Sequence, residues 1–407
     1  MNSIFKKYIP FLQEGDYFFV IEIFGSIIRG SLILVQPTSK QVQVISSKQA
    51  LCEEANAEAF TRVLPELVKQ SDLPATTRVL ALLDHRRAAV VSAPIVLMRS
   101  DSRSELRQAE LENLVSQGLW KLVNMHRPVA AAAMGIPETR VRLADADVMQ
   151  IKLDGHRVVN PIGFTARAIE LWYRETFVDE VLLKHLASAL TEDNLSSVVE
   201  APAMLAQLIA RVRPQESFLF VSVGAEESLV YHVDHLACAY VDSFHWGTET
   251  LLGGVAHQFG TTRELTSQLL SRYGAKQVSP AVRKAIEAAA SGELAILSNG
   301  IAAHQPKTGD LPVYVHGAVS LPEFLFDTTF TRRLGHSLSL TEVNEHFIGE
   351  QTGFVVQLQK SRTDLQTRFT FDAVLAVIAD MYAASAAPLV SKAVKQRARW
   401  GGISGTK

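Results

Sequence analysis

The feature that most constrains the fold is a strand meander that occurs twice along the chain. Residues 17–47 contain three successive apolar runs, YFFVIEIF, IIRGSLILVQ and KQVQVISS, separated by turn residues. The same plan returns at 218–244 in FLFVSVGAEESLVYHVDHLACAYVDSF. Each meander is followed by segments with helical spacing of apolar residues. This repetition indicates an internally duplicated α/β protein with two lobes. An unrelated α/β enzyme built on a single sheet is the alternative.

Size and composition restrict the class of protein further. The chain has 407 residues, which is more than one hydrophobic core organises, and its 47% hydrophobic and 20% charged residues are typical of globular proteins. A net charge of -2 gives no basic field, so we expect no nucleic-acid partner. Cys52 and Cys238 lack metal-ligand or redox spacing, and no run is apolar enough for a signal peptide or a membrane span. We therefore expect a cytoplasmic protein.

Between the two meanders lies a second strand-rich stretch at 139–178, preceded by a polar helix predicted over 102–124. It contains the turn text DGHRVVNPIGF, in which Asn-Pro and Gly reverse the chain. This segment resembles the D-G-x-x-V-x-N-P-x-G-x-x-G-x-x-L-like hairpin of the bacterial cell-division protein family FtsA, where it belongs to a small subdomain inserted into the first lobe. The matching residues are Asp154, Gly155, Val158, Asn160, Pro161, Gly163 and Leu171.

Two further segments resemble the same family. HWGTETLLGGVAHQFGTTRELTSQLLSRYG is similar to its helix pair, and PVYVHGAVSLPEFL is similar to the strand and turn that cover the adenosine. The matching residues are Gly247, Thr250, Leu251, Leu270, Tyr273, Gly274, Gly317, Ser320 and Leu321. The resemblance spans 17–384. It implies an actin-like (ribonuclease H-like) duplicated two-lobe α/β fold with a small inserted α+β subdomain in the first lobe.

The resemblance also implies domain boundaries. The expected parts are 1–100 for the first part of lobe one, 101–180 for the inserted subdomain, 181–212 for the return to lobe one, 213–384 for lobe two with a reduced helical subdomain at about 275–310, and 385–407 for a basic tail.

In actin-like ATPases, two Gly-rich hairpins hold the phosphates through backbone N–H groups, and acidic side chains bind magnesium through water. The resemblance places the nucleotide-contacting positions of this chain at Glu22, Gly25, Ser26, Gly224, Ser228, Gly317 and Ser320. Phe24 replaces a glycine of the first hairpin, and Glu226 and Glu227 bring carboxylates toward the phosphates. We therefore predict degenerate loops in a pseudoenzyme without catalytic residues. An active Mg-ATP-binding ATPase is the open alternative.

Other chemistries have less support in the sequence. His232, His235 and His245 lie near two aspartates, but strand geometry puts residues i and i+3 on opposite faces, so we expect no metal site. The motifs of hydrolases, metalloproteases and P-loop enzymes are absent.

The resemblance implies a cytoplasmic scaffold in bacterial cell division that associates with itself and with an FtsZ-like tubulin homologue. FtsA proteins attach to the membrane by a C-terminal amphipathic helix. The tail here offers Lys392, Lys395, Arg397, Arg399 and Trp400, enough for weak peripheral contact with the inner face of the cell membrane. Segment 274–312 leaves room for little more than one helix, where FtsA carries a strand-containing subdomain that contacts FtsZ. A PilM-like type IV pilus assembly scaffold is therefore the second alternative.

Overall fold

The computed structural model describes residues 15–25, 27–51, 57–69, 73–74, 76–189, 195–307, 309–317, 321–357 and 367–382. Ser26, Ser320 and the predicted tail with Lys392, Lys395, Arg397, Arg399 and Trp400 lie outside these ranges.

The first lobe is built on a six-stranded sheet of order β15-β3-β2-β1-β4-β9. Strands β1, β2 and β3 form the predicted antiparallel meander, while β4 and β9 add in parallel beside β1. This confirms the first meander. The lobe contains β1 (Asp16–Phe24), β2 (Ile27–Gln36), β3 (Gln41–Leu51), α1 (Ala57–Lys69), β4 (Arg78–Leu83), α3 (Glu180–Ala189), β9 (Leu195–Glu200), α4 (Ala201–Val212), β15 (Val355–Gln357) and α10 (Thr367–Tyr382).

The second lobe repeats this plan. Its strands run β12-β11-β10-β13-β14 across a sheet, an antiparallel meander followed by two parallel strands, which matches β3-β2-β1-β4-β9 strand for strand. The lobe contains β10 (Ser217–Val223), β11 (Ser228–Asp234), β12 (Ala237–Phe244), α5 (Thr248–Phe259), α6 (Arg263–Gly274), α7 (Pro280–Ala303), β13 (Val313–Gly317), η3 (Glu323–Phe326), α8 (Thr328–Arg333), β14 (Leu340–Val343) and α9 (Glu345–Thr352). Two lobes of one topology form the duplicated actin-like fold and exclude the single-sheet alternative.

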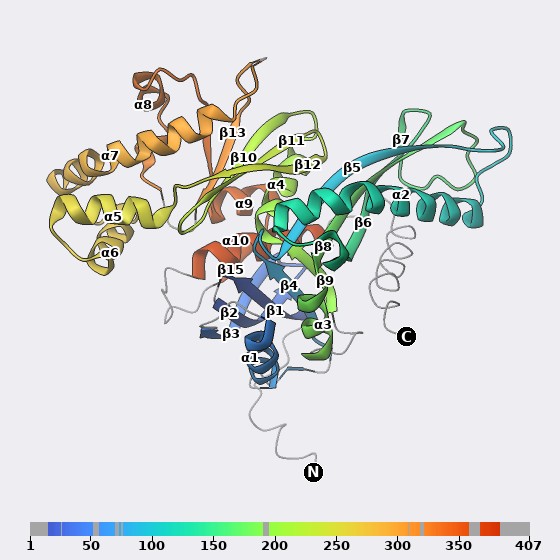
Figure 1. Ribbon diagram of the computed structural model, residues 1–407, viewed down its shortest axis with the longest axis horizontal. Helices are drawn as coiled ribbons and strands as arrows, with labels where there is room; N and C mark the ends of the chain where they lie inside the picture. Colours follow the sequence, from blue (N-terminus) through green and yellow to red (C-terminus); the bar gives the residue numbers. More distant parts are fainter. Residues whose placement is uncertain are drawn as a thin grey trace, which may run out of the picture.

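An inserted subdomain extends from the first lobe, at the upper right of Figure 1. It comprises β5 (Ala88–Met98), α2 (Gln108–Met134), η2 (Glu138–Arg140), β6 (Val141–Leu153), β7 (His156–Val158) and β8 (Ala168–Asp179). Its antiparallel sheet β5-β8-β6-β7 continues the sheet of the second lobe through a contact of β5 with β12. Strand β5, the first strand of this sheet, precedes residue 101, where the insertion was predicted to start. The predicted domain boundaries themselves stay predictions.

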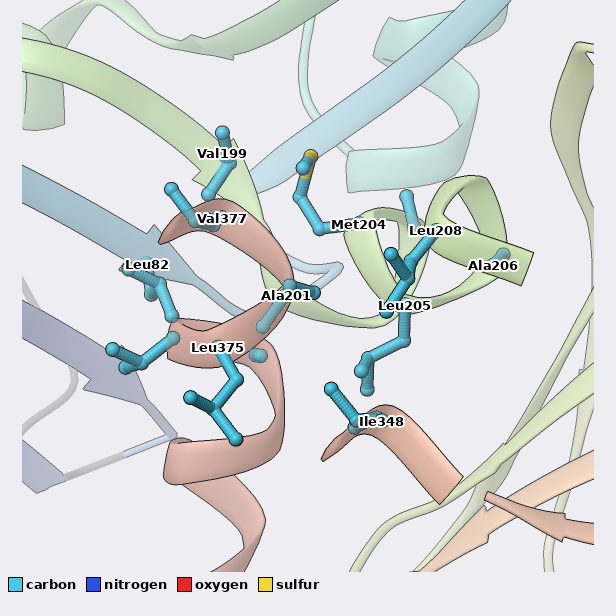
Figure 2. Close-up of a cluster of buried hydrophobic side chains, with 14 of the residues drawn as sticks. Leu82, Val199, Ala201, Met204, Leu205, Ala206, Leu208, Ile348, Leu375 and Val377 are labelled. Atoms are coloured by element: carbon cyan, nitrogen blue, oxygen red, sulfur yellow. The ribbon is translucent and has the colours of Figure 1, made fainter. Parts of the chain in front are cut away.

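Helices α4 and α10 pack against each other where the lobes meet (Figure 2). Every residue of α4 from Ala201 to Ala210 is buried, because the helix lies between the two sheets. Buried charges join the same region: the Arg174 guanidinium lies 2.8 Å from Asp380 of α10 and 3.5 Å from Asp147 of β6. Within the described residues, no helix is both long and apolar enough to cross a membrane.

Candidate functional site

The first predicted nucleotide hairpin is the turn between β1 and β2, and its carboxylate is already paired. Glu22 and Arg29 are opposite residues of the two strands. A carboxylate oxygen of Glu22 lies 3.6 Å from a guanidinium nitrogen of Arg29, and both side chains are buried. Arg29 thus supplies beside Glu22 the positive charge that a hydrated magnesium would bring.

The backbone of this turn is held by the protein itself. Gly25 adopts a left-handed conformation with φ of 55°, which favours glycine. Its N–H donates to the Asp84 carboxylate at 2.7 Å, and its carbonyl accepts from Arg87 at 2.8 Å. The N–H that the resemblance assigns to a phosphate therefore has an anionic partner within the chain.

The second predicted hairpin is the turn between β10 and β11, and α5 begins against it. The carbonyl of Gly224 accepts from the Thr248 N–H at 2.9 Å, and that of Ala225 accepts from the Glu249 N–H at 2.8 Å. A Cβ on Gly247 would lie 2.3 Å from the Ala225 oxygen, so only glycine permits this approach. The N–H groups that could make the helix start an anion site thus bond to the turn's own carbonyls.

The other predicted contact residues also have structural roles. Ser228 is fully buried, and its hydroxyl donates to the Trp246 carbonyl at 2.7 Å. Gly317 is the last residue of β13, opposite Val223 of β10, and is half-buried. The structure thus brings Glu22 and Gly25 together on one turn, and Gly224 and Ser228 on the other.

A charged turn that the sequence analysis did not single out connects the two hairpins. It is the run D-H-R-R at 84–87, between β4 and β5. Asp84 and Arg87 hold the first hairpin, as described above. Arg86 holds the second, because its guanidinium donates to the Glu227 carboxylate at 2.8 and 3.1 Å. The sequence signal was present: four polar residues follow directly on the buried strand RVLALL.

His85 adds an aromatic contact between the lobes. Its Nε2 lies 3.5 Å from Glu227, and its ring stacks on Tyr240 of β12 with centroids 6.1 Å apart. Burial lowers the pKa of His85, and the nearby Glu227 and Asp84 carboxylates offset only part of that shift. The imidazole is therefore mainly neutral at pH 7, and its stacking on Tyr240 is the main contact that it adds.

A second polar link lies deeper between the lobes, at Glu200. The carboxylate at the end of β9 is buried and accepts from the Val90 N–H at 2.9 Å and from the Tyr231 hydroxyl of β11. Burial raises the pKa of Glu200 to about 7 and also raises the pKa of Tyr231. Near neutral pH, Glu200 therefore exchanges a proton within an interlobe contact.

Metal chemistry has no geometric support in the described part of the chain, where no three His, Cys, Asp or Glu side chains gather as a ligand group. His235 bonds to the Pro214 carbonyl at 3.1 Å, and His232 is exposed on β11. The described charged contacts join the two lobes at the turns that were predicted to contact a nucleotide.

Comparison with known proteins gives low-identity structural likenesses. No protein-family model matches the sequence, and no curated protein matches it. The PilM-PilN type IV pilus biogenesis complex is similar at 15% identity and a TM-score of 0.44, over 93% of this chain and 97% of that one. The ethanolamine utilization protein EutJ from Carboxydothermus hydrogenoformans is similar at 13% identity and a TM-score of 0.37, over 82% and 85%. The MamK double helical filament is similar at 9% identity and a TM-score of 0.38, over 83% and 97%. The fold assignment rests on the duplicated strand order described above.

Proposed function

We propose that this chain is a non-hydrolysing actin-like scaffold whose two lobes are held together by its own charged side chains. The observation that carries the proposal is the turn at 84–87, which bonds to both hairpins at once: Asp84 accepts from Gly25, and Arg86 donates to Glu227. A protein with this arrangement has its interlobe geometry set without a nucleotide, so its work is binding other proteins.

The rival function, Mg-ATP hydrolysis, conflicts with these contacts. A polyphosphate between the turns would meet the carboxylates of Asp84 and Glu227, and like charges repel there unless a cation lies between them. The cationic side chains in reach, Arg86 and Arg87, already bond to Glu227 and to the first hairpin. ATP binding would have to break these bonds first, and that cost lowers its affinity.

The test is the thermal midpoint of the purified protein with millimolar Mg-ATP, Mg-ADP or Mg-GTP. A ligand that binds only the folded state raises the thermal midpoint by mass action. Since we propose that none of these nucleotides binds, we expect no shift of the wild-type midpoint. Glu227→Ala removes one carboxylate from between the two turns, and Glu249→Ala is the matched control, since its solvent-exposed pair with Arg263 joins α5 to α6. A rise of several degrees for wild type with ATP, lost in a Gly224→Val variant, would show that the chain binds ATP and would overturn the nucleotide-free scaffold.

For the cellular role, we propose a cell-division scaffold on the strength of the sequence resemblance, with self-association, an FtsZ-like partner and weak membrane contact through 385–407. One observation favours the pilus-assembly alternative. Between β12 and β13 the described chain forms α5, α6 and α7 and no strand, so the strand-containing subdomain that contacts FtsZ in FtsA has no counterpart there.

A gene deletion separates the two roles. Filamentous cells with normal surface pili would support division, whereas normally dividing cells without pili would support pilus assembly. The purified chain mixed with an FtsZ homologue gives the biochemical counterpart: binding by sedimentation supports the division role, and its absence removes the partner that the role requires.

A further inference from the structure

Strand β5 of the inserted subdomain has one open edge. Along its other edge it pairs with β8 over its whole length, from Ala88↔Val178 to Met98↔Ala168. On the open side it meets β12 only at the pair Cys238↔Ser92. Beyond that pair β12 turns back into β11, so the rest of β5 extends past the end of the second lobe's sheet.

The register shows which backbone groups face this open edge. The Arg99 N–H donates to the Arg167 carbonyl at 2.9 Å, which makes 99/167 a hydrogen-bonded pair. Because such pairs alternate along antiparallel strands, the backbones of Pro94, Val96 and Met98 point away from β8. Their three carbonyls, and the N–H groups of Val96 and Met98, have no backbone partner among the described residues.

The side chains of the same residues are apolar and exposed. Val96 is 58% exposed and Met98 65% exposed, whereas Leu97 between them is buried against α2. Trp172 of β8 lies opposite Pro94 and extends the apolar surface, with the Lys152 ammonium 5.4 Å from its ring centroid. Proteins normally protect an apolar edge strand with charge, a bulge or a covering segment. Here Pro94 removes one donor, and Val96 and Met98 remain open.

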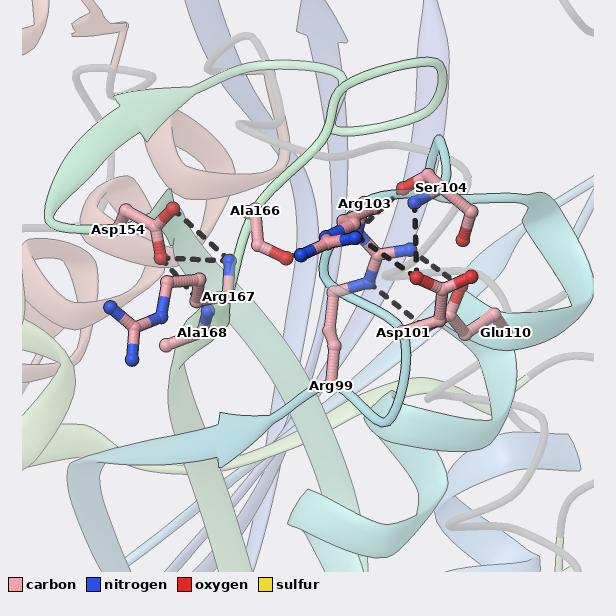
Figure 3. A network of polar contacts seen from close by, with 9 residues as sticks. All are labelled: Arg99, Asp101, Arg103, Ser104, Glu110, Asp154, Ala166, Arg167 and Ala168. Atoms are coloured by element: carbon pink, nitrogen blue, oxygen red, sulfur yellow. Dashed lines mark hydrogen bonds and ion pairs between the residues drawn. The ribbon is translucent and has the colours of Figure 1, made fainter.

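Both ends of the open edge are limited. At one end, the β11–β12 turn and Cys238 occupy the place beside Ser92. At the other end, polar contacts join three loops to one another (Figure 3). The Asp154 carboxylate accepts from the N–H groups of Arg167 and Ala168, and Arg99 bonds to Glu110 and to the Ser104 and Ala166 carbonyls. A segment added to this edge therefore spans about five residues.

We propose that the edge Pro94–Met98 binds a short extended segment of a partner protein by β-augmentation. The partner's backbone bonds to Val96 and Met98, and apolar side chains at two alternate positions cover Val96, Met98 and Trp172. A second copy of this chain fits less well. In an antiparallel pairing centred on Val96, Ser100 of the second copy would need the place that Cys238 takes beside Ser92. The proposal is independent of whether a nucleotide binds between the two hairpins.

The probe is a phage-displayed library of random seven-residue peptides, selected against the full chain. We expect enriched peptides to carry apolar residues at positions i and i+2. Val96→Pro removes one edge donor, and proline is tolerated on edge strands, so affinity should fall at least about tenfold. Val96→Thr keeps the donor and the branched side chain and should stay within about threefold.

A second readout needs no variant. On wild type, the selected peptide should slow hydrogen exchange of the Val96 and Met98 amides and leave the exposed residues of α2 unchanged. Three results would overturn the proposal: no enrichment of alternating apolar peptides, equal binding to a folded Val96→Pro variant, or unchanged exchange at both amides. A concentration-dependent dimer by sedimentation that Val96→Pro abolishes would assign the edge to a second copy instead.

Discussion

Glu227 is one of the two residues expected to bring a carboxylate toward the phosphates, and this carboxylate bonds to Arg86 of the other lobe. Asp84, on the turn at 84–87 that also carries Arg86, accepts from the Gly25 N–H. Both side chains lie at the turns that the resemblance assigns to the phosphates. At this scale, the contacts that support the proposed scaffold are made by carboxylates, and a carboxylate repels a phosphate.

A double-mutant cycle on Arg86→Ala and Glu227→Ala measures this contact in urea unfolding. Arg86 is 66% exposed, so solvent screens the pair, and we expect a coupling free energy of about 0.5–1 kcal/mol. The control cycle on the surface pair Arg263 and Glu249 should give less, because its single contact is 3.2 Å long and Glu249 is 44% exposed, against 19% for Glu227. Zero coupling for Arg86 and Glu227 would remove the pair as an interlobe contact.

Glu200 makes stability depend on pH. Its pKa is raised from 4.5 to about 7 in the folded state, so the protonated form favours folding. This contribution is complete below pH 4.5 and is lost as pH rises to 7, a difference of about 3 kcal/mol. We expect the wild-type unfolding free energy, relative to Glu200→Gln, to fall across that window. A Glu200→Gln profile parallel to that of wild type would contradict the assignment.

At the scale of elements, the second hairpin and the start of α5 form one unit, since Thr248 and Glu249 donate to the turn's carbonyls. This unit depends on Gly247, which the resemblance matched to a family glycine without explaining why glycine is needed there. Gly247 is needed because the backbone of Ala225 passes where a side chain would begin.

Gly247→Ala should therefore lower the unfolding free energy by about 2–4 kcal/mol, because the nearest obstacle is backbone and cannot move alone. Gly292→Ala is the matched control: it lies exposed in α7, and nothing lies within 4 Å of its added Cβ. That variant should gain up to about 1 kcal/mol from helix propensity. Chemical unfolding of both variants checks the pair, and equal effects would refute the steric explanation.

Local patterns predicted these elements well where burial follows sequence period, as in the β1–β3 and β10–β12 meanders. They predicted less where packing against residues distant in sequence decides the length of an element or its contacts. The helix expected to end at residue 124 continues to Met134 through Pro128, because Ala130, Ala131 and Met134 are buried in the core of the inserted subdomain. The Arg86–Glu227 contact joins residues that are 141 positions apart in the sequence, so no local pattern of apolar and polar residues could predict it. Ser26 and Ser320, predicted for the cleft, lie outside the described residues.

At the scale of the whole molecule, α10 connects all three parts. Its Asp380 bonds to Arg174 of the inserted subdomain and to Arg211 of α4. Helix α10 itself lies where the two sheets face each other. Relative movement of lobes and insertion therefore has to rearrange a buried ion network.

Asp380→Asn leaves the buried Arg174 without its nearest carboxylate, so we expect a loss of about 3 kcal/mol in unfolding free energy. Replacing both partners, Arg174→Met with Asp380→Leu, should lose less, because the most deeply buried charge is then removed and the remaining partners, Asp147 and Arg211, are 17% and 28% exposed. Urea unfolding of the two proteins checks the order. A double variant less stable than the single one would contradict it.

The strand order of the first lobe also decides when that lobe can be finished. Its sheet takes β15 beside β3, and its core takes α10, both from the last part of the described chain. The second lobe draws its strands from one continuous stretch, β10 to β14. During synthesis the lobe that emerges first is therefore completed last. Its apolar surface around Phe18 and Val20 cannot be covered by α10 until the last part of the described chain has been synthesised.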